Sequence, residues 1–281
     1  FLTPTDYGIL SLVNLLLNIA NSIFSLGTQS SVFRFYKKDE PANNGALYFS
    51  STILIFIWIT FLLTLSFVFK KNISLVLFDT PVYHIHIFVG LLMTAFISFY
   101  NIPMFMLRAE KKSKKFIKYN FIKLLFNISF GILFVVVLKR NSLGALEASL
   151  LSTFLFAIFT NAKRIGMYDF IFDINKIKIM FHYGSPLIIS GIIMVFINSS
   201  DRYFLKLSYP LEEIGIYSIG YTIGSSINIF VSSFQTAWPQ MMFQISDESE
   251  SSDKYSNVFT YYVYFIGLVW ISLSSLSYEI V

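Results

Sequence analysis

Residues 185–205 read SPLIISGIIMVFINSSDRYFL, and this stretch decides the class of protein. Pro186 suits the first turn of a helix, where a missing backbone N–H costs nothing, and a long apolar run follows it. Asp201 and Arg202 interrupt the run before it becomes apolar again at Tyr203. Read as one helix, the stretch is a membrane span with an acid and a base in its final third. Ionisable groups at that depth are costly and usually face a protein interior or a wet cavity, so the pair is a candidate functional site.

A plainer interpretation of the same residues stays open. Asp201 and Arg202 can also lie at the membrane interface, where they only end the span. In that case neither side chain contributes to function. If the pair lies inside the span, we expect Arg202 to face a cavity and Asp201 to contact a neighbouring helix, because adjacent residues on a helix point about 100° apart.

The composition of the 281 residues is that of a membrane protein. Hydrophobic residues make up 55% and charged residues only 13%, whereas soluble domains carry about 25% charged residues. The mean hydropathy is +0.65. The 32 Phe and 17 Tyr suit a lipid-facing surface with aromatic belts at the interfaces. There is no cysteine, which excludes disulfides and thiol chemistry, and we expect no catalytic residue and no metal site.

Apolar segments long enough to cross a bilayer recur along the chain. They cover about residues 8–33, 45–69, 83–107, 116–138, 143–162, 184–207, 214–238 and 258–278. Between the fifth and sixth segments, residues 163–183 mix apolar and charged side chains, which is typical of an amphipathic segment in the plane of the membrane surface. We therefore expect an N-terminal lobe at 1–162, an amphipathic cytoplasmic linker at 163–183, and the first three helices of a C-terminal lobe at 184–281.

The distribution of cations predicts the orientation of these spans. Loops 34–44, 108–118, 163–183 and 239–257 hold fourteen Lys or Arg, whereas the loops on the other side hold six. The positive-inside rule places the first group in the cytoplasm. Both ends of the chain are then expected outside.

A weak internal repeat supports a division into two lobes. After a shift of 207 residues, DYGILS at 6–11 lies over EIGIYS at 213–218. The shift spans six predicted helices, so both copies have the same orientation, as in transporters built from two parallel halves. The helix that should precede residue 6 is absent from the sequence. The fold class predicted is thus an all-α polytopic membrane protein, with eight helices of a larger two-lobe transporter truncated at both ends.

Polar side chains inside the spans are the candidates for a substrate cavity. Asn14, Asn18 and Asn21 share one helical face, where amides either join helices by hydrogen bonds or line a cavity. Arg34 ends the first span, and Lys123 lies inside the fourth, from which a long side chain can also reach the interface. The candidates are Arg202, Asp201, Arg34, Asn14, Asn18, Asn21 and Lys123.

Several short motifs resemble one known family. They are LTPTDYG at 2–8, GTQSSVFRFY at 27–36, SPLIISG at 185–191, DRYFL at 201–205, EEIGIYSIGY at 212–221 and AWPQMMF at 237–243. In order and spacing they are similar to the second, seventh and eighth helices of polysaccharide-export flippases. These flippases belong to the multidrug/oligosaccharidyl-lipid/polysaccharide (MOP) exporter superfamily. The resemblance implies two lobes of about six or more helices around a central cavity that opens alternately to each side.

The resemblance also implies a function and a location. It implies transport of an oligosaccharide on an undecaprenyl pyrophosphate carrier across the cytoplasmic membrane of a bacterium or archaeon, for polysaccharides such as O-antigen or capsule. It implies no enzyme activity and no cofactor, with H⁺ or Na⁺ as the coupling ion. The implied partners are membrane lipids, a polysaccharide polymerase and chain-length machinery, and no nucleic acid.

The proposed cargo gives the cationic candidates a role. A guanidinium binds phosphate through a planar fork of donors, so Arg202 and Arg34 are the diphosphate candidates, with Lys123 as a third. One departure from the related peptidoglycan-precursor flippases is visible. Those proteins carry arginines deep in the second helix, where this chain has asparagines.

Two alternative functions remain at this point. One is an ion-coupled small-molecule or multidrug exporter of the same superfamily. The other is a membrane enzyme, such as a polysaccharide polymerase or acyltransferase. An enzyme requires a clustered catalytic set, and no predicted outer loop gathers His, Asp and Ser together.

Overall fold

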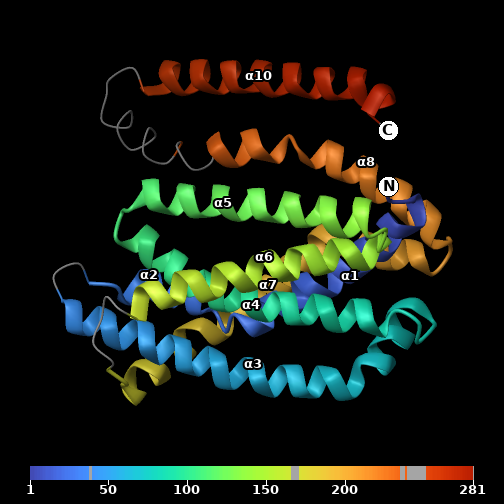
Figure 1. Ribbon diagram of the computed structural model, residues 1–281. Coiled ribbons are helices and arrows are strands. Elements are labelled where there is room, and N and C mark those ends of the chain that lie inside the picture. Colours follow the sequence, from blue (N-terminus) through green and yellow to red (C-terminus); the bar gives the residue numbers. More distant parts are fainter. Residues whose placement is uncertain (38–39, 166–170, 235–237, 239–250, 281) are drawn as a thin grey trace. The chain divides into compact units, whose positions relative to one another are not determined.

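The computed structural model describes residues 1–37, 40–165, 171–234, 238 and 251–280, and these residues form helices joined by short turns. The helices are α1 (Pro4–Phe24), α2 (Thr28–Phe35), α3 (Pro41–Phe78), α4 (His84–Ala109), α5 (Ser113–Gly131), the π-helical η1 (Ile132–Val137), α6 (Asn141–Ile165), α7 (Ile174–Lys206), α8 (Leu211–Ser225) and α10 (Ser251–Ile280) (Figure 1).

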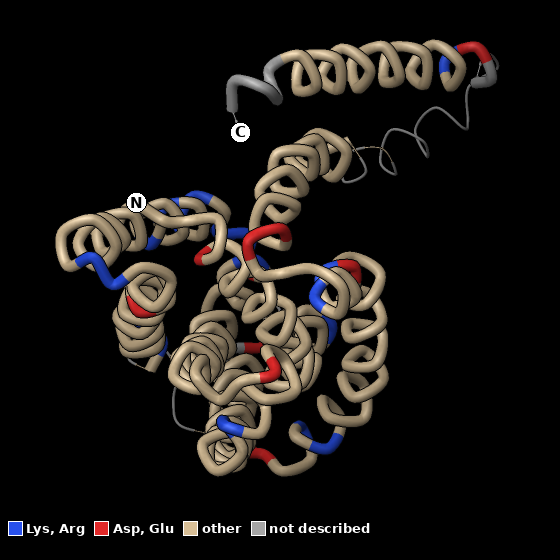
Figure 2. The backbone as a smooth tube through the Cα atoms, turned by 90° about the vertical axis from the view of Figure 1, so that its right-hand side faces the viewer, with Lys and Arg blue, Asp and Glu red and all other residues tan. Residues whose placement is uncertain are grey.

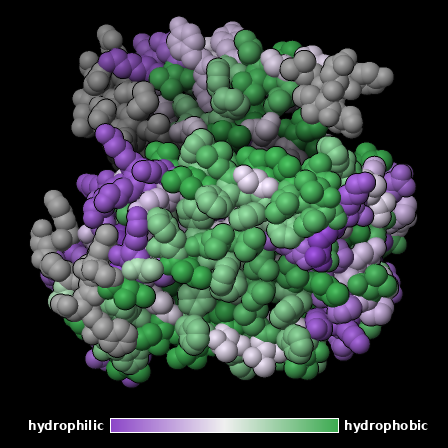
Figure 3. Space-filling view, in the orientation of Figure 1, coloured by the Kyte–Doolittle hydropathy of each residue, from purple (hydrophilic) through white to green (hydrophobic). Residues whose placement is uncertain are grey.

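Within the described residues, eight helical segments are long and apolar enough to cross a membrane. Each of them overlaps one segment predicted from the sequence, so the all-α polytopic fold is confirmed. Long uncharged runs separate the charged residues along the backbone (Figure 2). On the surface of residues 1–214 that faces the viewer in Figure 3, a broad apolar band lies between polar patches at the two ends of the helices.

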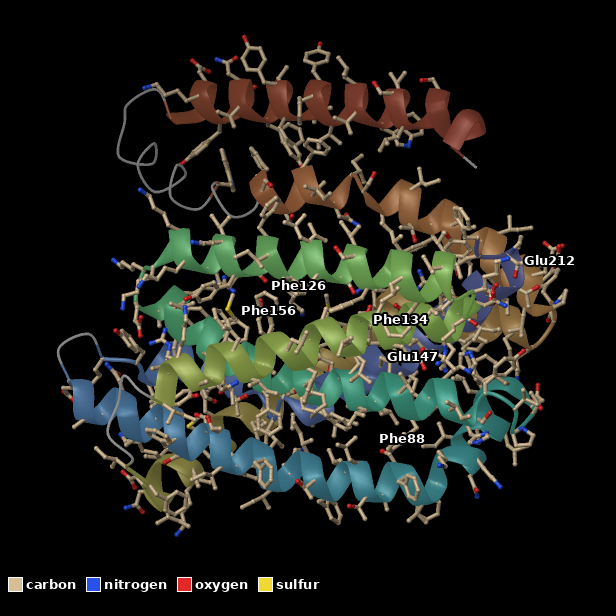
Figure 4. All side chains as sticks on the ribbon, viewed as in Figure 1. Phe88, Phe126, Phe134, Glu147, Phe156 and Glu212 are labelled. Carbon is tan, nitrogen blue, oxygen red and sulfur yellow. The ribbon has the colours of Figure 1, made fainter. Side chains whose placement is uncertain are left out.

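The chain divides into two units, residues 1–214 and residues 215–281. In the first unit α4 lies at the centre and packs on α1, α2, α3, α5 and α6. Leu12, Ile55 and Ile87 are fully buried in its core. Aromatic contacts add to this packing: Phe126 of α5 and Phe156 of α6 point toward each other, with ring centroids 5.8 Å apart (Figure 4).

The second unit contains most of α8, the residues that follow it, and α10. Phe234 stacks on Tyr262 of α10 with ring centroids 4.1 Å apart. Phe230 meets Phe265 edge to face at 5.6 Å. Aromatic pairs in these geometries attract beyond the area that they bury, so they hold α10 against the end of the preceding span.

The span predicted over residues 8–33 is present, but it is broken near its second end. Leu26 and Gly27 have φ of 47° and 63°, which separates α1 from α2. Hydroxyls add hydrogen bonds at the break, to carbonyls that also accept a backbone N–H: Thr28 Oγ1 donates to Ser25 O at 2.6 Å, and Ser31 Oγ donates to Gly27 O at 3.1 Å. Non-helical backbone at membrane depth is tolerated where protein buries it and supplies such partners.

α7 begins earlier than the sequence suggests. Asp173 caps its first turn by accepting from the backbone N–H of Asn175 at 2.9 Å, and the helix runs unbroken from Ile174 to Lys206. Pro186 therefore lies inside the helix, and its placement in a first turn is wrong. The capped start and the apolar positions between 174 and 183 extend the helix ahead of the proline.

The segment assigned to a linker is divided between two helices. Its first residues, 163–165, end α6, and residues 174–183 form the first turns of α7. Residues 166–170 lie outside the described part of the chain. The division into an N-terminal lobe, a linker and a C-terminal lobe stays a prediction.

The orientation can be checked by thiol labelling, because the chain has no native cysteine. Ser113, at the start of α5, and Ser208, after α7, are both exposed. We expect Ser113→Cys to react with an impermeant thiol reagent only after the membrane is opened, and Ser208→Cys to react in intact cells. Reversal of this pair would overturn the assignment of every loop to its side of the membrane.

Candidate functional site

α7 packs directly against α1 and α2, and glycines allow the close approach. A Cβ added to Gly184 would lie 2.3 Å from the carbonyl oxygen of Leu26, and one added to Gly191 would lie 2.8 Å from Ser22 Oγ. Near the start of α8, a Cβ on Gly8 would lie 1.9 Å from the carbonyl oxygen of Leu211. Small residues at such crossings let helix backbones come together in membranes. Along these contacts the residue numbers rise on α7 as they fall on α1, so α1 and α7 are antiparallel.

This register places two groups of candidate residues at the same depth. An apolar pocket of about 330 Å³ has Leu15 and Ile19 of α1 on one side and Ser200 and Tyr203 of α7 on the other. Residues 15–19 of α1 are therefore level with residues near 200 of α7. Asn14 and Asn18 are exposed on α1, at about the depth of the charged pair on α7.

The charged pair lies within the last two turns of α7. Asp201 and Arg202 are both half-buried, and Asp201 Oδ1 accepts from the backbone N–H of Arg202 at 2.9 Å. One turn later, Lys206 Nζ lies 2.5 Å from Asp79 Oδ2, at the end of α3. Lys206 is largely buried, with 8% of its side chain exposed. This ion pair connects the end of α7 to the end of α3, one turn beyond Arg202, although Asp79 is 78% exposed.

The other cationic candidates lie elsewhere. Arg34 is on α2, beyond the break in the first span, where its guanidinium carbon lies 4.6 Å above the ring of Tyr183. Lys123 is on α5, which packs on α4 and α6, and its Nζ lies 4.3 Å above the ring of Tyr100. The structure therefore brings Asn14 and Asn18 to the level of the charged pair and separates Arg34 and Lys123 from them.

The amides in the spans have two different environments. Asn21 is half-buried, and its Oδ1 has no hydrogen-bond partner within the described residues. By contrast, Asn120, Asn127 and Asn161 join helices. Asn120 Oδ1 accepts from Tyr100 OH at 2.9 Å, and Asn161 Oδ1 accepts from Tyr48 OH at 2.8 Å. Sequence reasoning did not single these three out, because an amide in an apolar run is consistent both with a hydrogen bond between helices and with the lining of a cavity.

A buried ion pair was also missed. Arg164 of α6 forms a bidentate pair with Glu110, which follows α4, and the second contact, Nη2 to Oε2, is 3.2 Å long. Lys112 Nζ lies 2.8 Å from the same carboxylate. Arg164 is 4% exposed. The available signal was Glu110 itself, a lone acid among six cations in residues 108–118.

Asp6 connects the start of α1 to α6. Its carboxylate accepts from the backbone N–H of Thr3 at 3.0 Å and from that of Ser142 at 3.1 Å, in a capping box with Thr3. Ser142 Oγ lies 3.3 Å from His86 Nε2 of α4. A capping residue three positions before an acid, with Pro4 between them, is a recognisable helix start. Among the described residues, no three His, Cys, Asp or Glu side chains gather to hold a metal ion.

The fold defines a class of membrane protein. A solved structure of a multidrug resistance MATE family transporter of the MOP superfamily, in an inward-facing conformation, matches with a TM-score of 0.63 and 18% identity. The match covers 81% of this chain and 55% of that chain, so the chain spans about half the length of that transporter. At this identity the likeness shows the fold, and the chain is a multi-pass membrane protein with the fold of MOP transporters.

The family follows from the sequence as a whole. The family model described as "Polysaccharide biosynthesis protein" matches residues 1–278. The chain therefore belongs to this polysaccharide biosynthesis family. No curated protein matches the chain.

Proposed function

We propose that the chain is part of a flippase that moves lipid-linked oligosaccharide units across the cytoplasmic membrane by alternating access. The observation that carries the proposal is a polysaccharide biosynthesis family match over residues 1–278 on a chain with a MOP transporter fold. An undecaprenyl pyrophosphate carrier is the proposed lipid, and a proton or sodium gradient is the proposed driving force. A transporter, rather than an enzyme, is what this family and fold favour.

The physics of the cargo agrees with the candidate residues. A diphosphate-sugar headgroup is large, polar and anionic, so its unaided passage through hydrocarbon is prohibitive. Amides and a guanidinium replace some of the hydrogen bonds that the headgroup makes in water. Asn14, Asn18, Asp201 and Arg202 lie at a common depth on α1 and α7, and we propose that the two amides and the Arg202 guanidinium contact the headgroup there. The apolar pocket between α1, α3 and α7 suits hydrocarbon rather than sugar.

The test is the deletion of the gene in its host. We expect surface polysaccharide to be lost and carrier-linked sugar to accumulate on the cytoplasmic side of the membrane. Restoration of the gene should reverse both effects. Normal surface polysaccharide with no accumulation of carrier-linked sugar in the deletion strain would contradict the proposal.

A second candidate function is an ion-coupled small-molecule exporter. It is favoured by the likeness to a multidrug resistance transporter. Under this alternative, the deletion strain should become more sensitive to lipophilic cations while its surface polysaccharide stays normal. The two functions therefore predict opposite results in the same pair of strains.

The Arg202→Lys variant tests the proposed contact with phosphate. It keeps the charge but loses the bidentate fork. A hydrogen bond to a charged group contributes about 1.5–3 kcal/mol, so we expect polysaccharide export to fall about tenfold or more, with protein abundance unchanged. Arg140→Lys is a matched control, because that guanidinium pairs with Glu147 at 2.9 Å on another helix. Full export by the double variant Asp201→Asn/Arg202→Gln at normal abundance would end the functional claim for the pair.

A further inference from the structure

A separate polar pocket lies where α2 ends and α3 and α7 begin. Its volume is about 250 Å³. Arg34, Lys37, Lys176 and Asn43 form its polar rim, and Leu47 and Met180 are among its apolar lining. The positive-inside rule assigns this end of the helices to the cytoplasm.

Hydrogen bonds hold the three helices together around the pocket. Lys176 Nζ of α7 donates to Asn43 Oδ1 of α3, and Asn43 Nδ2 donates to the carbonyl of Phe35 at 3.3 Å. Ser31 Oγ of α2 donates to the carbonyl of Met180 at 3.1 Å. These hydrogen bonds therefore connect α2, α3 and α7 around the pocket in the absence of a ligand.

The guanidinium of Arg34 is also positioned. It lies over the ring of Tyr183, which belongs to α7. A cation above an aromatic face is attracted by the ring quadrupole. This contact leaves the guanidinium N–H donors available for other partners, and a guanidinium can bind two oxygens of one phosphate. The Lys176 ammonium has three donors in total, of which Asn43 takes one.

The charge of the pocket is positive. Within the part of the chain that the structure describes, its lining contains three cations and no carboxylate. Of the described acids nearby, Glu40 pairs with Lys37 at 2.9 Å and offsets that cation, and Asp173 caps the start of α7. An anion bound at the rim would therefore meet attraction from Arg34 and Lys176, and the described lining presents no carboxylate to it.

Beneath this rim the pocket is apolar. Ile179, which also lines the pocket, is 51% exposed and offers apolar surface to a ligand, whereas Leu47 and Met180 are each 1% exposed and pack behind it. Phe35 packs edge to face with Tyr183 at 5.8 Å between ring centroids. A small soluble anion would gain no binding free energy from this apolar lining. An amphiphile whose phosphate meets the cations and whose chain covers the apolar side chains would use both parts of the pocket.

We propose that this pocket binds the phosphate group of a membrane lipid at the cytoplasmic surface. Anionic headgroups are concentrated there and attract basic residues near the bilayer. The phosphate can belong to an anionic phospholipid or to a lipid-linked diphosphate, and the chemistry of recognition is the same for both. The proposal stands on the geometry of the pocket and does not depend on the transport function.

The experiment is lipid retention by the purified protein in detergent, measured by native mass spectrometry. The probes are phosphatidylglycerol, phosphatidylcholine with the same acyl chains, and undecaprenyl diphosphate. The pocket variant is Arg34→Gln/Lys37→Gln/Lys176→Gln. The matched control is Lys111→Gln/Lys114→Gln/Lys118→Gln, which removes the same charge from exposed residues that are predicted to lie on the same side of the membrane.

We expect the wild-type protein to retain phosphatidylglycerol in preference to phosphatidylcholine. In the pocket variant the dissociation constant for phosphatidylglycerol, for undecaprenyl diphosphate, or for both should rise at least tenfold, and the lipid affected identifies the source of the phosphate. The control should change less than twofold, and the thermal midpoints of all three proteins should agree. Equal losses in both variants, or no loss in either, would overturn the proposal. Lipid binding that depends on the pocket in a protein that does not export polysaccharide would contradict only the proposed function.

Discussion

Replacement of Glu110 with alanine is expected to destabilise the first unit by about 3–5 kcal/mol, because it removes one partner of a buried ion pair. Arg164 is 4% exposed, and the Glu110 side chain is 6% exposed. The carboxylate also meets Lys112, so one substitution affects the connections between α4, α6 and the turn that precedes α5. The measurement is the midpoint of unfolding in detergent, with protein abundance in the membrane as a second readout.

Two further variants make this test specific. Glu40→Ala removes a carboxylate from the exposed pair with Lys37, and exposed pairs contribute about 0–1 kcal/mol, so its midpoint should barely move. The double variant Glu110→Leu/Arg164→Met replaces both charges with apolar groups and should recover most of the loss, because apolar replacements of buried ion pairs are often neutral. If Glu110→Ala shifts the midpoint no more than Glu40→Ala does, the buried pair has no structural role.

Replacement of Gly27 or Gly184 with alanine is expected to prevent α7 from packing on the break between α1 and α2. A Cβ at Gly27 would lie 2.4 Å from the Gly184 carbonyl oxygen, and the obstructing atoms belong to backbone, which cannot rotate away. Overpacking of this kind costs about 1–3 kcal/mol and occasionally more. At Gly27 the φ of 63° adds about 1–2 kcal/mol for any residue with a side chain. We therefore expect the larger loss for Gly27→Ala.

The chain supplies a matched control for these glycines. Gly131, the last residue of α5, has no atom within 4 Å of an added Cβ. Gly131→Ala should leave the unfolding midpoint unchanged or slightly higher, since alanine favours the helix by about 0.5–1 kcal/mol. Thermal unfolding monitored by size-exclusion chromatography compares all three variants. The close crossing of α1, α2 and α7 would be contradicted if the midpoint of Gly131→Ala fell as far as those of Gly27→Ala and Gly184→Ala, or if none of the three midpoints fell.

Export should follow the same order if the α1–α7 contact supports function. Asn14 and Asn18 lie at the level of Asp201 and Arg202 in a register where α1 and α7 approach closely at Gly184 and Gly191. A variant that separates these helices would therefore disturb the proposed headgroup contacts, although none of the residues that make those contacts is substituted.

The sequence by itself determined the class of the protein and its membrane spans. Apolar runs of twenty or so residues have few stable alternatives to a helix in a bilayer, because each backbone group must be paired within its own segment. That constraint is local, which explains why all eight predicted spans are present in the structure. The motifs in residues 2–8 and 185–221 likewise led to a family that the match over residues 1–278 supports.

Tertiary structure decided what the polar residues contact. Glu110 and Arg164 lie 54 positions apart and read as loop charges, yet they form a buried pair, because the ends of α4 and α6 meet. Arg34 and Lys176 were both visible as cations, but only the crossing of α2, α3 and α7 places them around one pocket. Hydropathy reports the depth of a side chain, whereas its partners depend on helix packing, which small residues such as Gly27 and Gly184 direct and which no local pattern reveals.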